Sequence, residues 1–479
     1  MNNTLLEKVR QGEYLTLGER ISLVLRLSIP AILAQISTII MEYIDASMVG
    51  SLGASSSAAI GIVSTTTWLI GGLCGAIGTG FTVGIAHRIG AGEEKEARKC
   101  VKTGLITVLC FALSLMVLGI LIHKALPRWM GGSPEVLVDA SHYFLVFSLM
   151  LPIMQINYTG SGMLECSGNM KVPSILNILM CFLDVIFNAF FIFPSRTVDM
   201  WGYSIRVPGV NLGVMGAAIG TLCSELVGAV CILLAILKFS DMLHLRKEEK
   251  GGMNREEWWT SIKMSLPVML SSAIMGSAYV VSTRIVSPLG NVSITANSFS
   301  ITAESLCYMP GYGISHAATT LVGQAKGAER RFLSRKFAYL SIIIGMIVMA
   351  LAGVLLYIFA PQMIAIMSPD EGVRALGTTI LRIEAFAEPM FGASIVAEGV
   401  FRGLGKTGTP SALNLLSMWC VRLPLSAFAA IHYGLVGVWY VMCIELCFRG
   451  TIFIIAIYKT FHEKKIQDAT KVLESKMKI

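Results

Sequence analysis

The chain has 479 residues, of which 54% are hydrophobic and only 14% are charged. Soluble proteins carry about 25% charged residues, so this composition excludes a soluble globular protein and predicts a chain that lies mostly in lipid. The net charge of +8 does not indicate nucleic-acid binding, because the basic residues are gathered in short segments between long apolar stretches.

The apolar stretches are each long enough to cross a hydrocarbon core of about 30 Å as a helix. The sequence therefore predicts an all-α integral membrane protein with twelve transmembrane helices, at 27–49, 59–86, 104–122, 141–164, 175–194, 213–237, 261–286, 294–322, 338–359, 377–401, 411–432 and 434–458. Residues 1–26 hold seven charges and no short apolar core. We expect no removable signal peptide, and the first helix is then itself the anchor.

Basic residues mark one side of the membrane. Of the 38 Lys and Arg residues, 29 lie in alternate segments: the N-terminus, the loops near 87–103, 165–173, 238–263, 323–337 and 402–406, and the C-terminal tail. Cytoplasmic segments carry such an excess. We expect a multi-pass protein of a prokaryotic inner membrane with both termini in the cytoplasm.

The chain repeats itself once, at an offset of 237 residues. Pro173-Ser174-Ile175-Leu176-Asn177 returns as Pro410-Ser411-Ala412-Leu413-Asn414, and Leu52-Gly53 returns as Leu289-Gly290. Six crossings return the chain to its starting side, so both copies insert in the same orientation. We predict two six-helix lobes, 1–237 and 261–479 with its cytoplasmic tail, joined by a cytoplasmic linker at 238–260 and related by a pseudo-twofold axis along the membrane normal.

The two copies differ after the fifth span. The first copy carries a polar segment from Pro194 to Val210, whereas the second passes from His432 almost directly to Gly434. This segment is expected to lie outside the cell, where it could form a short hairpin.

Ionisable residues inside a membrane cost about 2.5–3.5 kcal/mol each on insertion scales, so they should face a partner or a cavity. Acidic residues outnumber basic ones within the predicted spans: Glu42, Asp45, Asp184, Glu225, Glu304, Glu384, Glu388, Glu398 and Glu445 against Arg284, Arg382, Arg422 and Arg449. Some of the acids therefore cannot be neutralised by pairing. They must carry a proton or hold a cation.

The acids lie on polar stripes at helical spacing. The stripes are Gln35, Thr38, Glu42 and Asp45; Asn177, Cys181, Asp184 and Asn188; Asn297, Ile301, Glu304 and Tyr308; and Glu384, Glu388 and Phe391. Most of these acids fall in the outer half of the membrane, so we infer an acidic cleft that opens outward. A carboxylate there can exchange a proton for Na⁺ or for an organic cation.

Several of these acids also have structural interpretations. Glu445 and Arg449 have the i, i+4 spacing of an ion pair. Glu225 and Glu398 could belong to packing networks, and Glu384 could pair with a neighbouring arginine. Asp45 and Asp184 favour a functional role, because the first half has no arginine or lysine within its spans.

Three motifs resemble those of multidrug and toxic compound extrusion (MATE) transporters. Met48-Val49-Gly50-Ser51-Leu52-Gly53 after Asp45 resembles the end of the first helix in that family, Thr320-Leu321-Val322-Gly323-Gln324 with Gly327 resembles a second segment, and Phe401-Arg402-Gly403-Leu404-Gly405-Lys406-Thr407 a third. The resemblance covers essentially the whole chain and is nearest to the DinF-like branch.

This resemblance implies an ion site in the first lobe. The branch uses an Asp on helix 1, an Asn and a later Asp on helix 5, and a Thr on helix 6. Asp45 and Thr221 match the first and last of these. On helix 5, Asp184 stands in place of the usual Asn and Asn188 in place of the usual Asp.

The sequence thus predicts a cation-coupled antiporter, driven by Na⁺ or H⁺, that exports amphipathic cationic drugs or toxic metabolites by alternating access. We expect no catalytic residue, no cofactor other than the coupling ion, no nucleic acid partner and a monomer in the bilayer. The coupling ion, with Na⁺ as the metal, is assigned to Asp45, Asp184, Asn188 and Thr221. The substrate is assigned to Glu42, Glu304, Glu388, Gln35, Tyr308 and Phe391.

Two alternatives stay open at this point. A lipid-linked precursor flippase of the same superfamily would need a basic cavity for pyrophosphate, whereas this chain offers acids. A membrane-embedded enzyme would need a catalytic motif, and the sequence contains neither HExxH nor GxSxG.

Overall fold

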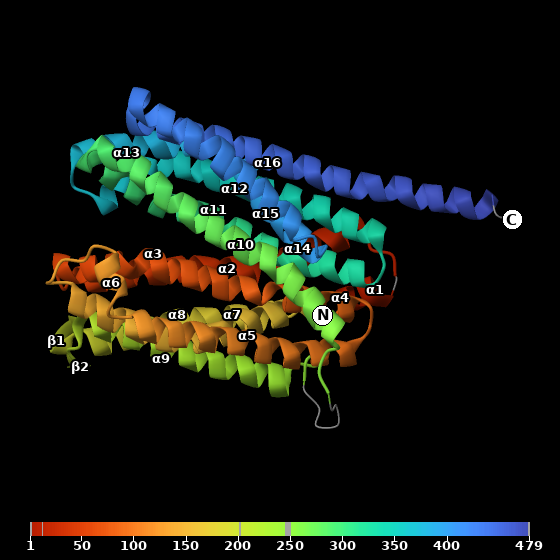
Figure 1. Cartoon of the computed structure of the whole chain (residues 1–479), viewed down its shortest axis with the longest axis horizontal. Coiled ribbons are helices and arrows are strands. Elements are labelled where there is room, and N and C mark those ends of the chain that lie inside the picture. The colour runs from red at the N-terminus through yellow and green to blue at the C-terminus, as the bar shows by residue number, and fades with distance from the viewer. Residues whose placement is uncertain (1, 12, 201–202, 245–250, 478–479) are drawn as a thin grey trace. The chain divides into compact units, whose positions relative to one another are not determined.

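The computed structural model describes residues 2–11, 13–200, 203–244 and 251–477, and nearly all of them are helical (Figure 1). The first half contains α1 (Asn2–Gln11), α2 (Leu17–Gly50), α3 (Ala54–Ile77), α4 (Thr79–Gly90), α5 (Glu94–Ile122), α6 (Leu126–Trp129), α7 (Leu137–Cys166), α8 (Lys171–Ile192), the strands β1 (Pro194–Met200) and β2 (Tyr203–Val210), α9 (Gly213–Leu234) and the π-helical turn η1 (Ala235–Phe239). The second half contains α10 (Arg255–Val286), the 3₁₀ turn η2 (Ser287–Leu289), α11 (Asn291–Gly327), α12 (Arg331–Met367), α13 (Glu371–Glu384), α14 (Glu388–Gly403), α15 (Gly408–Leu415), the π-helical η3 (Leu416–Arg422) and α16 (Leu423–Met477).

The helices confirm the predicted spans. Nine helical stretches of the described residues are long and apolar enough to cross a membrane. The last stretch, Gly408–His462, has 55 residues and holds two spans, because the backbone leaves helical geometry at Gly434. The two remaining predicted spans are α11, which is rich in Ser, Thr and Gly, and the pair α13–α14, in which the helix is interrupted.

The repeat is visible in the backbone. The starts of α3, α5 and α8 return, at the same offset of 237 residues, as the starts of α11, α12 and α15. Three left-handed residues return as well: Gly53 as Gly290, Gly92 as Glu329 and Gly168 as Gly405. The two halves therefore change direction at equivalent points, although their sequences differ at most positions.

By contacts the described residues divide into two compact units. One unit takes residues 29–276, and the other takes the described parts of 1–28 and 277–479. These bounds differ from the lobes predicted from the repeat, since 238–276 go with the first half and 1–28 with the second. The predicted bounds of the lobes, and the pseudo-twofold axis between them, stay predictions.

Within the unit of residues 29–276, the start of α10 packs against the junction of α3 and α4. Ser265 Oγ accepts a hydrogen bond from Gly80 N at 2.9 Å and donates one to the Ile77 carbonyl at 2.7 Å. A side chain at Gly80 would meet the Ser261 carbonyl oxygen at 1.8 Å. Glycine at this position therefore allows the two helices to touch through their backbones.

The polar segment after the fifth span forms the expected hairpin. Strands β1 and β2 pair antiparallel, with Pro194 opposite Val210 and an irregularity between Pro194 and Arg196. The Arg196 guanidinium lies 4.0 Å from the centre of the Phe193 ring, which ties the hairpin to the end of α8.

The N-terminal helix α1 packs on the unit that contains α11. Its apolar residues Leu6 and Val9 are buried. Arg330 Nη1 donates to the carbonyls of Lys8 and Val9 at 3.1 and 3.2 Å, and thus caps the last turn of α1. Lys8 donates to Glu19 at 2.8 Å, and this hydrogen bond raises the pKa of the lysine above its usual value.

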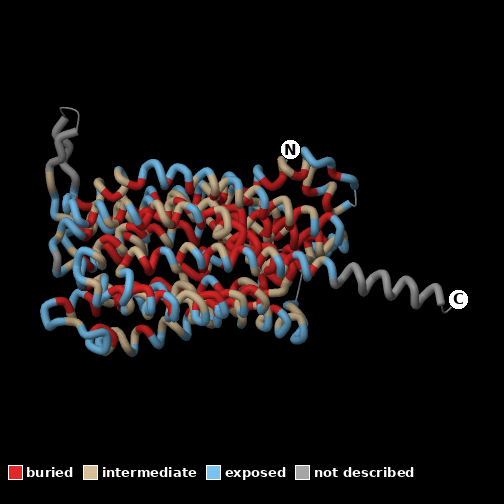
Figure 2. The backbone as a smooth tube through the Cα atoms, turned by 90° about the horizontal axis from the view of Figure 1, so that it is seen from above, coloured by how far each residue is buried: buried red, intermediate tan, exposed pale blue. Residues whose placement is uncertain are grey.

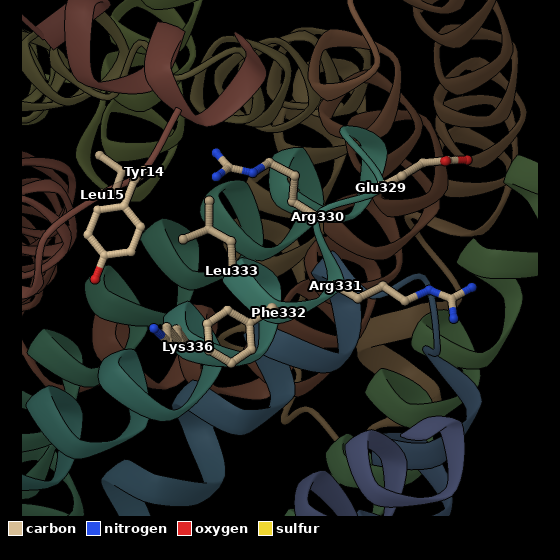
Figure 3. A pocket seen from close by; sticks show the side chains of 8 residues that line it. All are labelled: Tyr14, Leu15, Glu329, Arg330, Arg331, Phe332, Leu333 and Lys336. Atoms are coloured by element: carbon tan, nitrogen blue, oxygen red, sulfur yellow. The ribbon is translucent and has the colours of Figure 1, made fainter. Parts of the chain in front are cut away.

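A cavity of about 400 Å³ lies beside this contact (Figure 3). It is lined by Tyr14, Leu15, Glu329, Arg330, Arg331, Phe332, Leu333 and Lys336. In Figure 3, Tyr14 and Leu15 face Arg330 and Leu333. None of the residues assigned above to an ion or a substrate lines this cavity.

Exposed apolar residues show which helix faces meet lipid. In Figure 2 buried and exposed residues alternate along the helices. In α5 the most apolar stretch has a mean hydropathy of 2.9, yet only 17% of its residues are buried. Its exposed side chains include Ile106, Val117 and Leu121. Such a face is stable only in a hydrocarbon environment.

A candidate ion-coupling site

A polar cluster joins α2, α8 and α9 within the unit of residues 29–276. Asn188 Nδ2 donates to Asp45 Oδ1 at 2.9 Å and to Asp184 Oδ2 at 2.8 Å. The other oxygen of Asp184 accepts a hydrogen bond from Ser224 Oγ at 3.0 Å. Asp184 and Asn188 are 0% and 1% exposed, whereas Asp45 is half-buried. Hydrogen bonds from Asn188 thus join three of the four predicted ion ligands directly.

The close packing of α8 on α9 depends on Gly220. A Cβ atom at this position would lie 2.0 Å from Asn188 Oδ1 and 2.9 Å from Asn188 N. No side chain fits there, so glycine lets the backbone of α9 lie directly on Asn188. This contact holds the amide of Asn188 between the two carboxyl groups.

The two carboxyl groups of this cluster require a positive charge. Asp45 and Asp184 accept hydrogen bonds from the same Asn188 nitrogen, so their carboxyl groups lie close together. Among the described residues, no lysine, arginine or histidine forms an ion pair with either of them. Two adjacent buried carboxylates cannot both remain ionised without a counter-charge. The arrangement is suited to accept either a proton or a small cation.

The available ligand atoms fit Na⁺ as well as a proton. Asn188 Oδ1 is buried and has no hydrogen-bond partner within the described part of the chain. It lies against Gly220, so the oxygens left for an ion are those of the two carboxylates and of Thr221, hard donors that suit alkali and alkaline-earth ions. No three His, Cys, Asp or Glu side chains of the described residues group as metal ligands.

Thr221 lies on the same face of α9 as Ser224. Its Oγ1 donates to the Ala217 carbonyl at 3.2 Å and lies near Asp184. Its oxygen keeps lone pairs for an ion. Ser224 was missed from the sequence, although its i+3 spacing from Thr221 was a usable signal.

Ser224→Ala is expected to weaken cation binding at this site about 10-fold. A hydrogen bond from a neutral donor to a charged group contributes about 1.5–3 kcal/mol, and Ser224 holds Asp184 in the orientation that receives the ion. Isothermal titration of the purified protein with Na⁺, and with protons, measures the change. Ser57→Ala, an exposed residue of α3, serves as the control and should bind as the parent does.

The predicted polar stripes of α2 and α8 also meet. Asn177 Nδ2 donates to Thr38 Oγ1 at 3.0 Å and to the Ala34 carbonyl at 3.1 Å. Of the remaining predicted residues on α2, Gln35 is half-buried and Glu42 is exposed. Glu42 therefore offers an accessible carboxyl group close to Asp45.

The other predicted substrate residues lie in the unit that contains α11–α16. Glu304 and Glu388 are only 4% and 1% exposed. Tyr308 and Phe391 meet edge to face, with ring centres 5.6 Å apart, and Tyr312 joins Tyr308 at 6.0 Å. The structure therefore brings the aromatic residues together on a partly exposed surface and places the two acids in the interior.

Several acids have the structural partners that the sequence allowed. Arg449 binds Glu445 through two nitrogens, each 2.8 Å from a carboxylate oxygen, which confirms the predicted pair. Glu398 pairs with Arg402. Asn157 Nδ2 donates to the Glu225 carboxylate at 2.5 Å and to the Glu225 carbonyl at 2.8 Å.

The chain is similar to known transporters along most of its length. The probable multidrug resistance protein NorM of Thermotoga maritima is 24% identical over 437 residues, which cover 89% of this chain and 90% of that protein. The NorM protein of Pseudomonas aeruginosa is 25% identical over 87% of this chain and 85% of its own length. A crystal structure of a MATE protein in complex with MaL6 matches with a TM-score of 0.85, at 20% identity, over 93% of this chain and 97% of that one.

The MatE family model matches twice, at residues 30–190 and 267–428, one match in each half of the chain. The two matches begin 237 residues apart, as the repeat requires. Together they cover more than half of the sequence, and the solved structures share the fold of twelve helices in two lobes. The chain belongs to the MATE family of multidrug efflux transporters.

Proposed function

We propose that this membrane transporter is an antiporter that exports amphipathic cationic drugs or toxic metabolites in exchange for inward Na⁺ or H⁺. The observation that carries the proposal is the cluster in which Asn188 bridges Asp45 and Asp184. The cluster contains two acids and, among the described residues, no basic partner. Two ionised carboxylates without a counter-charge inside the membrane would lower the stability of the folded protein.

The coupling ion drives transport by stabilising one of two conformations, the outward-facing or the inward-facing one. It enters between Asp45 and Asp184, where Asn188 and Ser224 hold the carboxylates in place. A charge that moves inward across 100 mV releases about 2.3 kcal/mol, which corresponds to about a 50-fold bias. A ligand shifts a conformational equilibrium only through different affinities for the two states. The site must therefore bind the ion more tightly when it faces outward.

The substrate residues divide into accessible and buried groups. Glu42 and Gln35 on α2, and Tyr308 and Phe391 on the other unit, are at least partly exposed. Each group by itself can attract a cationic aromatic compound, the carboxylate through its charge and the rings through stacking. Glu304 and Glu388 are buried, so a substrate would reach them only after a rearrangement of their unit.

The localisation follows from the same arguments. The chain is a multi-pass membrane protein, and we propose that it lies in a prokaryotic inner membrane. The distribution of its basic segments supports cytoplasmic termini. A monomer is sufficient for this mechanism, because each chain carries both halves.

Transport by proteoliposomes tests the proposal directly. Purified protein is reconstituted, and efflux of a fluorescent lipophilic cation is followed under a Na⁺ gradient, a pH gradient or neither. We expect one of the two gradients to drive efflux against the substrate gradient, and its collapse by a matching ionophore to stop efflux. Equal efflux with and without both gradients would refute ion coupling.

A further inference from the structure

The cavity beside α1 lies where the segment after this helix meets the start of α12 (Figure 3). Tyr14 and Leu15, between α1 and α2, form one wall, and residues at the start of α12 form the other. All of them belong to the unit that contains α11–α16. The volume of about 400 Å³ lies in the usual range of small-molecule sites, about 300–1,000 Å³.

The walls of this cavity carry more positive than negative charge. Arg330, Arg331 and Lys336 line it, against a single acid, Glu329. In Figure 3, Lys336 extends on the same side of the α12 start as Tyr14, whereas Glu329 and Arg331 extend on the opposite side. The charge next to Tyr14 is therefore positive.

Two of the basic side chains have no acid to neutralise them. Lys336 Nζ lies 4.0 Å from the centre of the Phe332 ring, a contact that leaves its charge in place. Arg330 donates to backbone carbonyls only, those of Lys8, Val9 and Glu13. Among the described residues, no carboxylate forms an ion pair with either side chain. Both charges remain available to an anion.

The first turn of α12 adds positive potential. Phe332 and Leu333 lie in this turn and also line the cavity. The first N–H groups of a helix have no partner within the helix and attract anions. The backbone and the basic side chains therefore favour the same kind of ligand, which is a phosphate or another anion.

An exposed apolar face of α12 begins at this cavity. Phe332 is 67% exposed, and further exposed apolar residues follow Lys336 at spacings of three, four or seven residues. These are Ile343, Ile347, Leu351 and Val354. The spacing puts them on one side of the helix, where they meet hydrocarbon. The cavity is thus continuous with a surface that carries lipid chains.

We propose that this cavity binds the headgroup of an anionic phospholipid, with the phosphate against Lys336 and the first turn of α12. The acyl chains then follow the apolar face of α12, which is why the anion is a lipid rather than free phosphate. The predicted topology puts the loop 323–337 on the cytoplasmic side, and basic pockets between helices on that side suit anionic headgroups. Tyr14, which is 76% exposed, is of a residue type that gathers at membrane interfaces.

The bound lipid would join the N-terminal segment to α12, because Tyr14 and Lys336 lie on opposite walls of the cavity. It would add to the contact that Arg330 makes with the end of α1. Neither role depends on a coupling ion or on an exported substrate. Binding is therefore measured without substrate and without a gradient.

The experiment uses the purified full-length protein in a neutral detergent. Phosphatidylglycerol, phosphatidylcholine or glycerol 3-phosphate is added, and the affinity of the tightest-bound molecule is measured by native mass spectrometry. We expect phosphatidylglycerol to bind about tenfold more tightly than phosphatidylcholine, because each basic residue near an anionic headgroup contributes about a fivefold gain. Glycerol 3-phosphate, which has the phosphate without acyl chains, should bind more weakly than phosphatidylglycerol.

Lys336→Gln should weaken phosphatidylglycerol binding about fivefold and leave phosphatidylcholine binding unchanged, and Lys336→Arg should keep the parent affinity. Lys263→Gln is the matched control. Lys263 lies over the Trp259 ring at the same i, i+4 spacing, but it does not line the cavity. This variant should bind phosphatidylglycerol as the parent does.

Three results would overturn the proposal: equal affinity for the two phospholipids, equal affinity of Lys336→Gln and Lys263→Gln for phosphatidylglycerol, or glycerol 3-phosphate binding as tightly as phosphatidylglycerol. The last would indicate a site for free phosphate. Lys336 has no ion pair to lose, so its glutamine variant should melt at the parent temperature. If it fails to fold, Tyr14→Glu, at an exposed position of the opposite wall, puts a negative charge near the phosphate. Unchanged phosphatidylglycerol binding by this variant would refute the site.

Discussion

Asp184→Asn is expected to reduce gradient-driven efflux about 50-fold or more, while the protein still folds and inserts. Asparagine has nearly the shape of aspartate, and its carbonyl oxygen can still accept the hydrogen bond from Ser224. It removes the charge that attracts the coupling ion. Since one ion moving across 100 mV supplies about 2.3 kcal/mol, loss of coupling should remove about a 50-fold bias. Efflux from proteoliposomes at matched protein content measures the effect.

Asp139→Asn provides the control for this variant. Asp139 is exposed in the first turn of α7 and also lies in the first half of the chain. The substitution should leave efflux within about twofold of the parent, as surface changes usually do. Full efflux by Asp184→Asn would contradict the ion assignment, provided that the variant is reconstituted to the same density.

Gly220→Ala is expected to abolish transport and to lower the thermal stability of the protein. The new methyl group would lie 2.0 Å from Asn188 Oδ1 and 2.9 Å from the backbone nitrogen of the same residue. Rotation of the Asn188 side chain cannot relieve the second contact, so α8 must move away from α9. Overpacking of this kind costs about 1–3 kcal/mol. The displacement would also break the hydrogen bonds from Asn188 to Asp45 and Asp184.

Gly71→Ala is the matched substitution. Gly71 lies inside α3, and a Cβ atom there meets no atom within 4 Å. Alanine also favours a helix by about 1 kcal/mol over glycine, so this variant should melt at the parent temperature or above it. Melting of both variants in the same detergent, together with the efflux assay, separates crowding at α9 from a general effect of replacing glycine. Normal efflux by Gly220→Ala would show that α8 and α9 tolerate separation.

Most of the fold could be predicted because its signals are local and repeated. Apolar length located the spans, and the return of Leu52-Gly53 as Leu289-Gly290 located equivalent turns, which adopt the same left-handed geometry. Local sequence signals did not reveal that the helix of the tenth span is interrupted. Pro389 was visible within the tenth span, but its position alone does not say whether the helix bends or breaks there. In the structure α13 ends at Glu384 and α14 begins at Glu388, and Gly353 of α12 lies against the Ala385 carbonyl.

The ion cluster was only partly predictable for the same reason. Helical spacing put Asp184 and Asn188 on one face, and the family resemblance added Asp45. The spacing could not show that Asn188 lies between both carboxylates, because that depends on the missing side chain of Gly220. Nor could it show that Glu304 and Glu388 are buried together, since their helices are separated by more than sixty residues in sequence.

The matched turns of the two halves also bear on the history of the chain. Where the first half has Gly92, the second has Glu329, which keeps a left-handed backbone at φ 56°. For a residue other than glycine this conformation costs about 1–2 kcal/mol. The two halves therefore differ in side chain at this corner and still share the bend, although glutamate disfavours that backbone conformation. This is the pattern expected after duplication of one ancestral segment, because backbone conformation is retained for longer than amino-acid sequence.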